Sequence, residues 1–428
     1  MKTRSKTGAS SSSANLRLAE ERLLPTYQRP PLVFTHGKGA CVFDAPGKKY
    51  LDFLGGIAVN ALGHAHPRIV RVIRQEAARA IHLSNLFHNE FQGPLAEKLC
   101  RWSGMDRVFF ANSGTEAVDG ALKLARLFAH SAGTPKPRIL ALDNSFHGRT
   151  FGAISVTATE KYRRPFEPLV PGIEFVRFND AGDLQAKFDA SVCAVILETI
   201  QGEGGIHPVS EEFWNCAREL TVRNQSLLIA DEIQCGLGRT GRYFAYQKFS
   251  AKPDLVLVAK PLAGGLPLGA ILATQKVADA VSPGVHGTTF GGGPLVCATA
   301  LEFLRTVEEE SLLENIRDRG RELRAGLEAL AAKHPVIREI RGEGLMFGVE
   351  LSVDGAPFVA EALRRGLIIN CTHDYTLRLL PPFVVTRAQV REFLRLFELT
   401  LTKTPRAVPV SASAGTAEQT RVSRAAAR

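Results

Sequence analysis

The chain has 428 residues, of which 45% are hydrophobic and 22% are charged, and its formal net charge is +10. This composition is typical of a globular protein, and no apolar run approaches the ~18 residues of a membrane span, so we expect no membrane partner. Much of the positive charge lies at the ends, because residues 1–14 carry three basic side chains and no acid, and residues 405–428 carry four basic side chains and one acid. The body is nearly balanced, so the charge does not indicate a nucleic-acid partner.

The cysteines and the two ends of the chain bear on its compartment. The seven cysteines are dispersed without CxxC pairs, which favours free thiols in a reducing, cytoplasmic setting and argues against a metal site. Residues 1–14 and 405–428 are predicted to be disordered, because they are rich in Ser, Ala and charge and poor in large apolar residues. The first of these segments is also typical of an organelle import signal, so both readings of this leader stay open.

The predicted elements begin with a hairpin in residues 35–55, in which "DAPGKK" supplies the turn. Apolar runs, polar loops and helical stretches then alternate as far as residue 275, which predicts an α/β domain with a mainly parallel sheet. The predicted strands are 107–111, 138–142, 194–198, 226–230 and 254–259, and helices are predicted at 116–130 and 211–224.

The C-terminal part has a different pattern. Residues 312–404 contain a charged helix near 313–333, a strand in "GEGLMFGVEL" and a helix near 357–365, which is typical of an α+β unit. We therefore divide the chain into a large domain, 67–305, and a small domain built from 15–66 and 306–404.

Polar and titratable side chains follow the predicted strands at the point where each strand ends. Because the carboxyl ends of parallel strands meet at one edge of a sheet, a ligand is expected at that edge. The residues concerned are Asn112 to Thr115, Asp143 to Arg149, Glu198, Asp231 to Gln234, and Lys260.

The segment "NSGTEA", residues 112–117, joins a strand to a helix and has two readings. Ser113 and Glu116 fit a capping box, which needs no ligand. Alternatively, the N–H groups of Gly114 and Thr115 form a phosphate site at the positive end of the helix. The segment is neither GxGxxG nor a Walker loop, so a nucleotide is not indicated.

Lys260 ends a buried strand and is followed by a Gly264-Gly265 pair. A lysine in this place is ordinarily solvated, but a desolvated lysine loses its proton more easily and attacks carbonyl groups. Asp231 ends a different strand and is suited to pair with a ring nitrogen of an aromatic cofactor. A nucleophilic lysine, an aspartate and a phosphate site are together the requirements of pyridoxal 5′-phosphate (PLP).

A set of motifs in one order extends this reading. Across residues 24–403 the sequence resembles the class III, ornithine/acetylornithine-type, aminotransferases of PLP fold type I, and "GIAVNALGH" with "SFHGRT" is most similar to the acetylornithine type. The resemblance implies a seven-stranded, mainly parallel sheet and a smaller α+β domain. The motifs are "FDAPGKKYLDFLGGIAVNALGHAHP", "NSGTEA", "SFHGRT", "IQGEGG", "LLIADEIQCGLGRTG", "AKPLAGGLPLGA", "HGTTFGG" and "RGEGLMFGVEL".

The resemblance assigns cofactor roles by position. Lys260 would hold PLP covalently and move a proton, Asp231 would pair with the pyridine nitrogen, and Thr289 would reach the phosphate of a neighbouring subunit. This last role implies a homodimer with shared active sites. The remaining cofactor-binding residues would be Ser113, Gly114 and Thr115 at the phosphate, Phe146 stacked on the ring, and Gln234 near the phenolic oxygen.

The resemblance also assigns substrate roles. Arg149 and Arg378 would bind substrate carboxylates, because a guanidinium matches a carboxylate with two hydrogen bonds. Glu203 would neutralise Arg378 when a substrate with one carboxylate is present, although an exposed loop acid is the alternative reading. Tyr27 and Thr288 fall at positions near the substrate.

The expected function is transfer of the ω-amino group of N2-acetyl-L-ornithine to 2-oxoglutarate in arginine biosynthesis. Three alternatives stay open. The amino donor could instead be ornithine, succinylornithine, 4-aminobutyrate or acetyl-lysine; the reaction could be that of a PLP aminomutase or racemase, which does not need 2-oxoglutarate; or the chain could be a regulatory module. The last would need a DNA-binding domain, for which the residues before Leu24 are too few.

Overall fold

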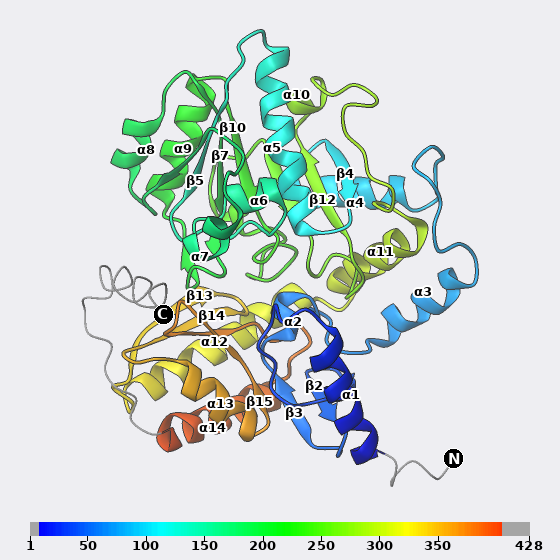
Figure 1. The fold of residues 1–428 in the computed structure, drawn as a ribbon, viewed down its shortest axis with the longest axis vertical. Helices are drawn as coiled ribbons and strands as arrows, with labels where there is room; N and C mark the ends of the chain where they lie inside the picture. The colour runs from blue at the N-terminus through cyan, green and yellow to red at the C-terminus, as the bar shows by residue number, and fades with distance from the viewer. Residues whose placement is uncertain (1–7, 405–428) are drawn as a thin grey trace.

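The computed structural model describes residues 8–404 and consists of two parts, seen one above the other in Figure 1. The upper part contains a seven-stranded sheet, and the lower part contains two four-stranded sheets. No helix within residues 8–404 has both the length and the apolar character needed to cross a membrane.

The seven strands of the large sheet lie in the order β4-β12-β11-β10-β7-β5-β6. β12 alone runs against the others, because both of its neighbours pair with it in antiparallel fashion, whereas the remaining pairs are parallel. The five predicted strands are all present, and the structure adds β6 and β12. The bounds are β4 Arg107–Ala111, β5 Arg138–Leu142, β6 Ile173–Val176, β7 Val192–Glu198, β10 Leu227–Asp231, β11 Leu255–Val258 and β12 Gly269–Ala273.

Continuous apolar runs form these strands because helices cover both faces of the sheet. In β10, Leu228 and Ala230 pack into one apolar core, while Leu227 and Ile229 pack into another on the opposite face. A strand buried on both faces shows no polar alternation. The helices of this part are α3 Pro67–Ala77, α4 Gln92–Ser103, α5 Gly114–Ser131, α6 Phe151–Ser155, α7 Glu160–Arg163, α8 Ala181–Lys187, α9 Glu211–Arg223, α10 Gln275–Ala278 and α11 Pro294–Glu309.

The lower part joins the two ends of the described chain. One sheet has the order β1-β2-β3-β15, so N-terminal strands pair with a C-terminal one. The predicted hairpin is confirmed, since β2 and β3 pair in antiparallel fashion across "DAPGKK". The elements are β1 Phe34–Lys38, β2 Cys41–Asp44, β3 Lys49–Asp52, α2 Gly55–Ala58, α12 Leu312–Ala331, α13 Ala356–Arg364, β15 Leu367–Ile368 and α14 Arg387–Lys403.

The second small sheet, β13-β14-β17-β16, faces the large part at the boundary between the two. All three of its strand pairs are antiparallel. A short hairpin of the large part, β8-β9, lies close to β13. The bounds are β8 Ile200–Gln201, β9 His207–Pro208, β13 Ile337–Glu343, β14 Met346–Leu351, β16 Asn370–Thr372 and β17 Thr376–Leu379.

The prediction of a disordered leader over residues 1–14 is wrong for residues 8–14, which belong to helix α1, Gly8–Arg22. The helix continues into "NLRLAEER", which has better helix formers than the Ser-rich start that suggested disorder. Residues 1–7 and the predicted tail 405–428 lie outside the described residues.

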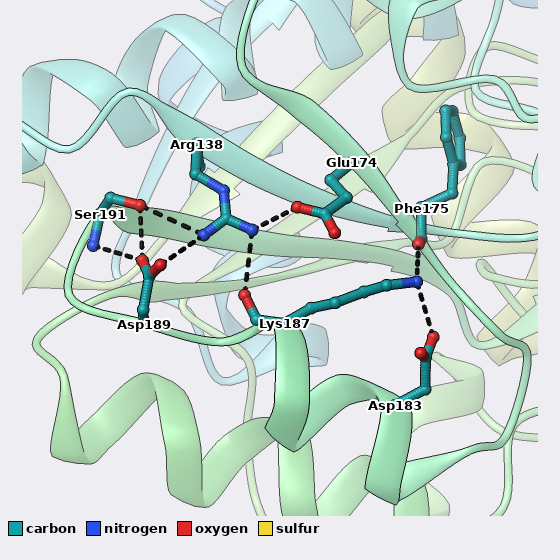
Figure 2. Close-up of polar contacts among 7 residues, drawn as sticks. All are labelled: Arg138, Glu174, Phe175, Asp183, Lys187, Asp189 and Ser191. Carbon is teal, nitrogen blue, oxygen red and sulfur yellow. Dashed lines mark hydrogen bonds and ion pairs between the residues drawn. The ribbon is translucent and has the colours of Figure 1, made fainter.

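An ion-pair network fixes the edge of the large sheet (Figure 2). Arg138, at the start of β5, donates to Asp189 at 2.7 Å and also to Glu174 on β6. Lys187, at the end of α8, donates to Asp183 at 2.9 Å and to the Phe175 carbonyl at 2.7 Å. These ion pairs are partly exposed to solvent, where each contributes only about 0.2–1 kcal/mol to the stability of the fold. They hold α8 against the sheet edge and take no part in the site described below.

Candidate active site

A cavity of about 460 Å³ opens at the carboxyl ends of the strands of the large sheet. Loops after β4, β5, β10 and β11 and the last residue of β7 all contribute to its wall, as the strand-end rule predicts. The structure therefore brings together eight of the predicted residues. They are Ser113, Gly114, Thr115, Phe146, Arg149, Asp231, Gln234 and Lys260.

The start of helix α5 contains the Ser113 cap of the first reading of "NSGTEA" and places the residues of the second reading in the cavity wall. Ser113 caps the helix by accepting a hydrogen bond from the N–H of Glu116 at 3.3 Å. The N–H groups of Gly114 and Thr115 belong to the first turn, where a helix offers them no partner, and both residues line the cavity. A Cβ on Gly114 would lie 2.8 Å from Ile233 Cδ1, so a larger residue would require the Ile233 side chain to move. This cradle suits an anion such as a phosphate.

Lys260 follows strand β11 and is half-buried in the cavity wall. Burial lowers the pKa of its amine from the usual value, and the carboxylates of Glu203 and Asp231 oppose this effect in part. Gly264 and Gly265 follow with φ values of +59° and +114°, a conformation that favours glycine. Gly265 also lines the cavity, so the chain leaves space beside the amine.

Asp231 ends β10, the strand next to β11, and is buried in the cavity wall, where two contacts hold it. Its Oδ2 lies 2.7 Å from His147 Nδ1, and its Oδ1 accepts the N–H of Ile233 at 3.0 Å. The other ring nitrogen of His147, Nε2, is buried with no hydrogen-bond partner among the described residues. The sequence reasoning gave His147 no role, although its position after a strand was the signal that could have found it.

Glu198 is a second acid of the cavity to which the sequence reasoning gave no role. It ends β7 directly beside Asp231 in the parallel register. Its carboxylate accepts the N–H groups of Phe146 at 2.9 Å and Gly202 at 2.8 Å. Burial raises the pKa of Glu198 to about 7, and the neighbouring charge of Asp231 adds to the rise. Glu198 therefore ties two loops of the cavity together.

Arg149 is exposed at the cavity mouth. Its guanidinium lies 3.7 Å from the centre of the Tyr162 ring and 5.6 Å from that of Phe146. Its backbone N–H donates to Thr115 Oγ1 at 3.0 Å, so the turn that carries it is fixed to helix α5. Such a cation, held over aromatic rings beside an anion cradle, is suited to bind a carboxylate.

Arg378 and Glu203 form an ion pair next to the cavity. Arg378 Nη1 donates to Glu203 Oε1 at 2.6 Å and to Gln234 Oε1 at 3.2 Å. The Arg378 side chain is fully buried, and its Nη2 has no hydrogen-bond partner among residues 8–404. Gln234 lines the cavity, so this hydrogen bond connects the ion pair of Arg378 and Glu203 to the cavity wall. A buried guanidinium with an unused donor can accept a carboxylate when Glu203 moves.

Besides Arg378 and Glu203, three further predicted residues do not line this cavity. Tyr27 is 72% exposed, with the Arg29 guanidinium 5.1 Å from its ring centre. Thr288 Oγ1 accepts a hydrogen bond from Asn112 Nδ2 at 3.1 Å, which connects it to the cavity wall through Asn112. Thr289 lies in the same exposed loop, and its predicted contact belongs to a second subunit. Within residues 8–404, no cluster of three or more His, Cys, Asp or Glu residues could hold a metal ion.

The comparisons with known proteins agree with this geometry. The family model described as "Aminotransferase class-III" matches residues 24–401. The chain belongs to the class-III aminotransferase family. It is 45% identical over 378 residues to the acetylornithine aminotransferase of Caldanaerobacter subterraneus subsp. tengcongensis, covering 88% of this chain and 96% of the relative. The enzyme of that name from Methanocaldococcus jannaschii is 42% identical over 381 residues, covering 89% and 96%.

Solved structures of class-III aminotransferases have the same fold. The ornithine aminotransferase of Toxoplasma gondii ME49 superposes with a TM-score of 0.88 at 32% identity, covering 94% of this chain and 99% of that one. The N-acetylornithine aminotransferase of Stenotrophomonas maltophilia K279a gives 0.78 at 34% identity, covering 90% and 98%. The family and fold inferred from the motifs are confirmed, and the chain is a transaminase.

Proposed function

We propose that this aminotransferase uses PLP to convert N2-acetyl-L-ornithine and 2-oxoglutarate into N-acetyl-L-glutamate 5-semialdehyde and L-glutamate, a step of arginine biosynthesis. The observation that carries the proposal is the convergence of Lys260, Asp231 and the first turn of α5 on one cavity. The names of the relatives support the choice of amino donor. A crystal structure of the Toxoplasma gondii ornithine aminotransferase, with a TM-score of 0.87, is described as having PLP at partial occupancy in its active site.

The cavity has a suitable group for each part of PLP. The N–H groups of Gly114 and Thr115 would hold the phosphate, and Asp231 would pair with the pyridine nitrogen. The Lys260 amine would form the covalent attachment, because burial favours its neutral, nucleophilic form. When bound, PLP supplies an acceptor for the amino group and an electron sink for the carbanion.

The protein's own residues would then perform two tasks. Lys260, once displaced by the incoming amine, would carry a proton between two carbon atoms of the reacting group, which requires a neutral base near the operating pH. The Asp231 carboxylate would lie beside the ring nitrogen, and His147 would hold that carboxylate in place through the 2.7 Å contact. Glu198 would fix the loop of Phe146, so that this ring lies against the cofactor.

Substrate choice would depend on two arginines. Arg149 at the mouth would bind the α-carboxylate of acetylornithine or the distal carboxylate of glutamate. Arg378 would bind the second carboxylate that only glutamate and 2-oxoglutarate carry. With acetylornithine present, Glu203 would stay on Arg378 and cancel its charge, as in the 2.6 Å ion pair. One cavity would thereby serve both half-reactions.

We extend the proposal to a homodimer with shared active sites. Exposed apolar side chains gather where the loop of residues 80–92 packs against the loop of residues 286–293, and Thr289 lies on this surface. Asn85 joins the two loops, donating to the carbonyls of Thr288 at 3.1 Å and Gly291 at 2.9 Å. Apolar patches of this kind mark interfaces. The side chains are Ile81, 65% exposed, Leu86, 86%, Phe87, 71%, and Phe290, 65%.

A panel of half-reactions tests the amino donor. Each candidate (acetylornithine, ornithine, succinylornithine, 4-aminobutyrate and acetyl-lysine) is mixed with the PLP-loaded enzyme, and loss of the cofactor's visible absorption band is followed by stopped flow. Acetylornithine is expected to give the highest kcat/KM, and turnover is expected to require 2-oxoglutarate. A faster donor would overturn the assignment of substrate, and turnover without 2-oxoglutarate would indicate an aminomutase or a racemase.

A further inference from the structure

Two arginines and a glycine form one row across the small sheet at the domain boundary. Arg341 on β13 pairs with Gly348 on β14, and Gly348 pairs with Arg378 on β17. Residues directly opposite each other in neighbouring strands project from the same face of a sheet. Figure 1 shows β13 and β14 just below the large part. Arg341 and Arg378 both donate hydrogen bonds to residues of the large part, so this face of the sheet meets it. Arg341 is not among the site residues predicted from the sequence.

The row supports the loop that carries Glu203. This loop, residues 202–206, joins β8 to β9. Arg341 binds the backbone of this loop, since its Nε and Nη2 both donate to the Gly205 carbonyl, at 3.2 and 2.9 Å. Arg378 binds the same loop through the Glu203 carboxylate. Between them Ile206 packs over Gly348, where any Cβ would lie 2.9 Å from the Ile206 Cβ.

The remaining contacts of Arg341 show that it is built into this place. The side chain is only 7% exposed, and its Nη1 donates to Glu339 and, at 2.5 Å, to Glu350. The two carboxylates orient the guanidinium, because ionic hydrogen bonds are about twice as strong as neutral ones. A further contact joins the same loop to the small sheet, since Thr372 Oγ1 donates to the carbonyl of Glu203 itself.

We propose that Arg341 is a positioning residue for Glu203 and, through it, a determinant of which substrate the enzyme prefers. This inference rests on the proposed function, in which Glu203 neutralises Arg378 for substrates with one carboxylate. Glu203 must leave Arg378 and return to it in each catalytic cycle. Arg341 holds the backbone two residues away, so the side chain moves while the loop stays. Without the hydrogen bonds from Arg341 the loop shifts, and Glu203 no longer pairs with Arg378. The unpaired positive charge of Arg378 then disfavours the substrate with one carboxylate.

The experiment compares two amino donors on the same PLP-loaded enzyme form, in single turnovers. Acetylornithine has one carboxylate and glutamate has two. In Arg341→Lys, the kcat/KM for acetylornithine is expected to fall roughly tenfold, the scale of a hydrogen bond to a charged group, while that for glutamate changes by less than about twofold. Arg324→Lys is the matched control, because Arg324 donates to the Gly342 carbonyl on the same strand, at 2.6 Å, and does not contact the loop. In Arg324→Lys, the ratio of kcat/KM for acetylornithine to kcat/KM for glutamate is expected to equal that of the wild type.

A second variant and a double mutant keep the proposal falsifiable. Thr372→Val releases the other carbonyl of the loop and is expected to shift the ratio in the same direction, which covers the case in which Arg341→Lys does not fold. In a Glu203→Ala background, Arg341→Lys is expected to leave the ratio unchanged. Equal losses for both donors, or an undiminished shift without Glu203, would overturn the proposal. If the wild type transfers no amino group from either donor, the proposed function itself is wrong.

Discussion

His147 Nδ1 lies 2.7 Å from Asp231 Oδ2, and both side chains are buried at the carboxyl edge of the large sheet. The two residues are far apart in the sequence, on the loop after β5 and at the end of β10, and the parallel sheet brings them together. The contact fixes one carboxylate oxygen and leaves Asp231 beside the cavity as a charged partner for a cofactor. It therefore gives the acid both its place and its orientation.

The first prediction concerns the charge of Asp231. Asp231→Asn keeps the shape of the side chain and removes its charge, so kcat is expected to fall roughly 10²-fold or more, the usual effect of removing one electrostatic group from an active site. Steady-state rates with acetylornithine and 2-oxoglutarate measure this. Asp254→Asn is the matched control, because Asp254 is also buried and ion-paired, 2.6 Å from Arg218, but precedes β11 at the opposite edge. The Asp254→Asn variant is expected to be less stable than the wild type and to have the same kcat. An Asp231→Asn enzyme with wild-type kcat would refute the role of Asp231.

The second prediction concerns Arg149 at the cavity mouth. Arg149→Ala removes a guanidinium that is suited to a carboxylate, so kcat/KM for acetylornithine and for glutamate is expected to fall roughly 10- to 100-fold. Arg164→Ala removes another exposed arginine, one that does not line the cavity, and it is expected to leave kcat/KM unchanged. Unchanged kcat/KM for both donors in Arg149→Ala would contradict the assignment of a substrate carboxylate to this residue.

The third prediction concerns pH and the buried acid Glu232. Its carboxylate accepts hydrogen bonds from Thr199 Oγ1 at 2.7 Å and from the N–H groups of Ala245 and Tyr246, both at 2.8 Å, yet burial raises its pKa to about 7 from an ordinary 4.5. Between these two pH values the folded protein binds the extra proton. The stabilisation is therefore complete below pH 4.5 and is lost as the pH rises through 7, at about 1.4 kcal/mol per pH unit.

Urea unfolding of the holoenzyme at pH 5, 6 and 7 measures this effect. The free energy of unfolding is expected to decline over this range by about 2 kcal/mol more in the wild type than in Glu232→Gln, which has no proton to lose. The comparison between the two proteins isolates Glu232 from Glu198, whose pKa is raised in the same direction. Identical pH slopes in the two proteins would show that Glu232 titrates at its ordinary value.

The fourth prediction concerns the dimer. Leu86→Asp places a charge in the exposed apolar patch and is expected to shift the protein from dimer to monomer, with loss of activity because the shared sites separate. Sedimentation velocity at several concentrations measures the shift. Val222→Asp, on the outer face of α9 where Val222 is 58% exposed, is the control and is expected to stay dimeric. A wild type that sediments as a monomer would contradict the proposal of shared sites.

The sequence was sufficient for those parts of the fold that follow from local pattern. Strands such as β7 and β10 were predicted because both faces are buried, and the rule that ligands bind at strand ends led to Asp231 and Lys260. Strands β6 and β12 were not predicted. "IEFV" is only four residues long, and "GAILA" follows a run of Gly, Pro and Leu that indicates a turn.

The partners of buried groups were the harder part. The sequence places His147 and Glu198 at strand ends, but only the register of β7, β5 and β10 shows that both lie beside Asp231. The pairing of Arg378 with Glu203 came from the family resemblance, and no local pattern predicts it. The contact of Arg341 with Gly205 likewise depends on how the two parts of the fold meet, which is a tertiary property.

Covalent attachment at Lys260 is the most direct test of the account. The enzyme is loaded with PLP, reduced with borohydride, digested and analysed by mass spectrometry, in parallel with Lys260→Ala and with Lys276→Ala, which replaces a lysine outside the cavity. One modified peptide, that of Lys260, is expected in the wild type and in Lys276→Ala. In Lys260→Ala, neither that modification nor the cofactor's visible absorption band is expected. A Lys260→Ala protein that keeps the band and still transfers amino groups at the wild-type rate would show that Lys260 is not the attachment site.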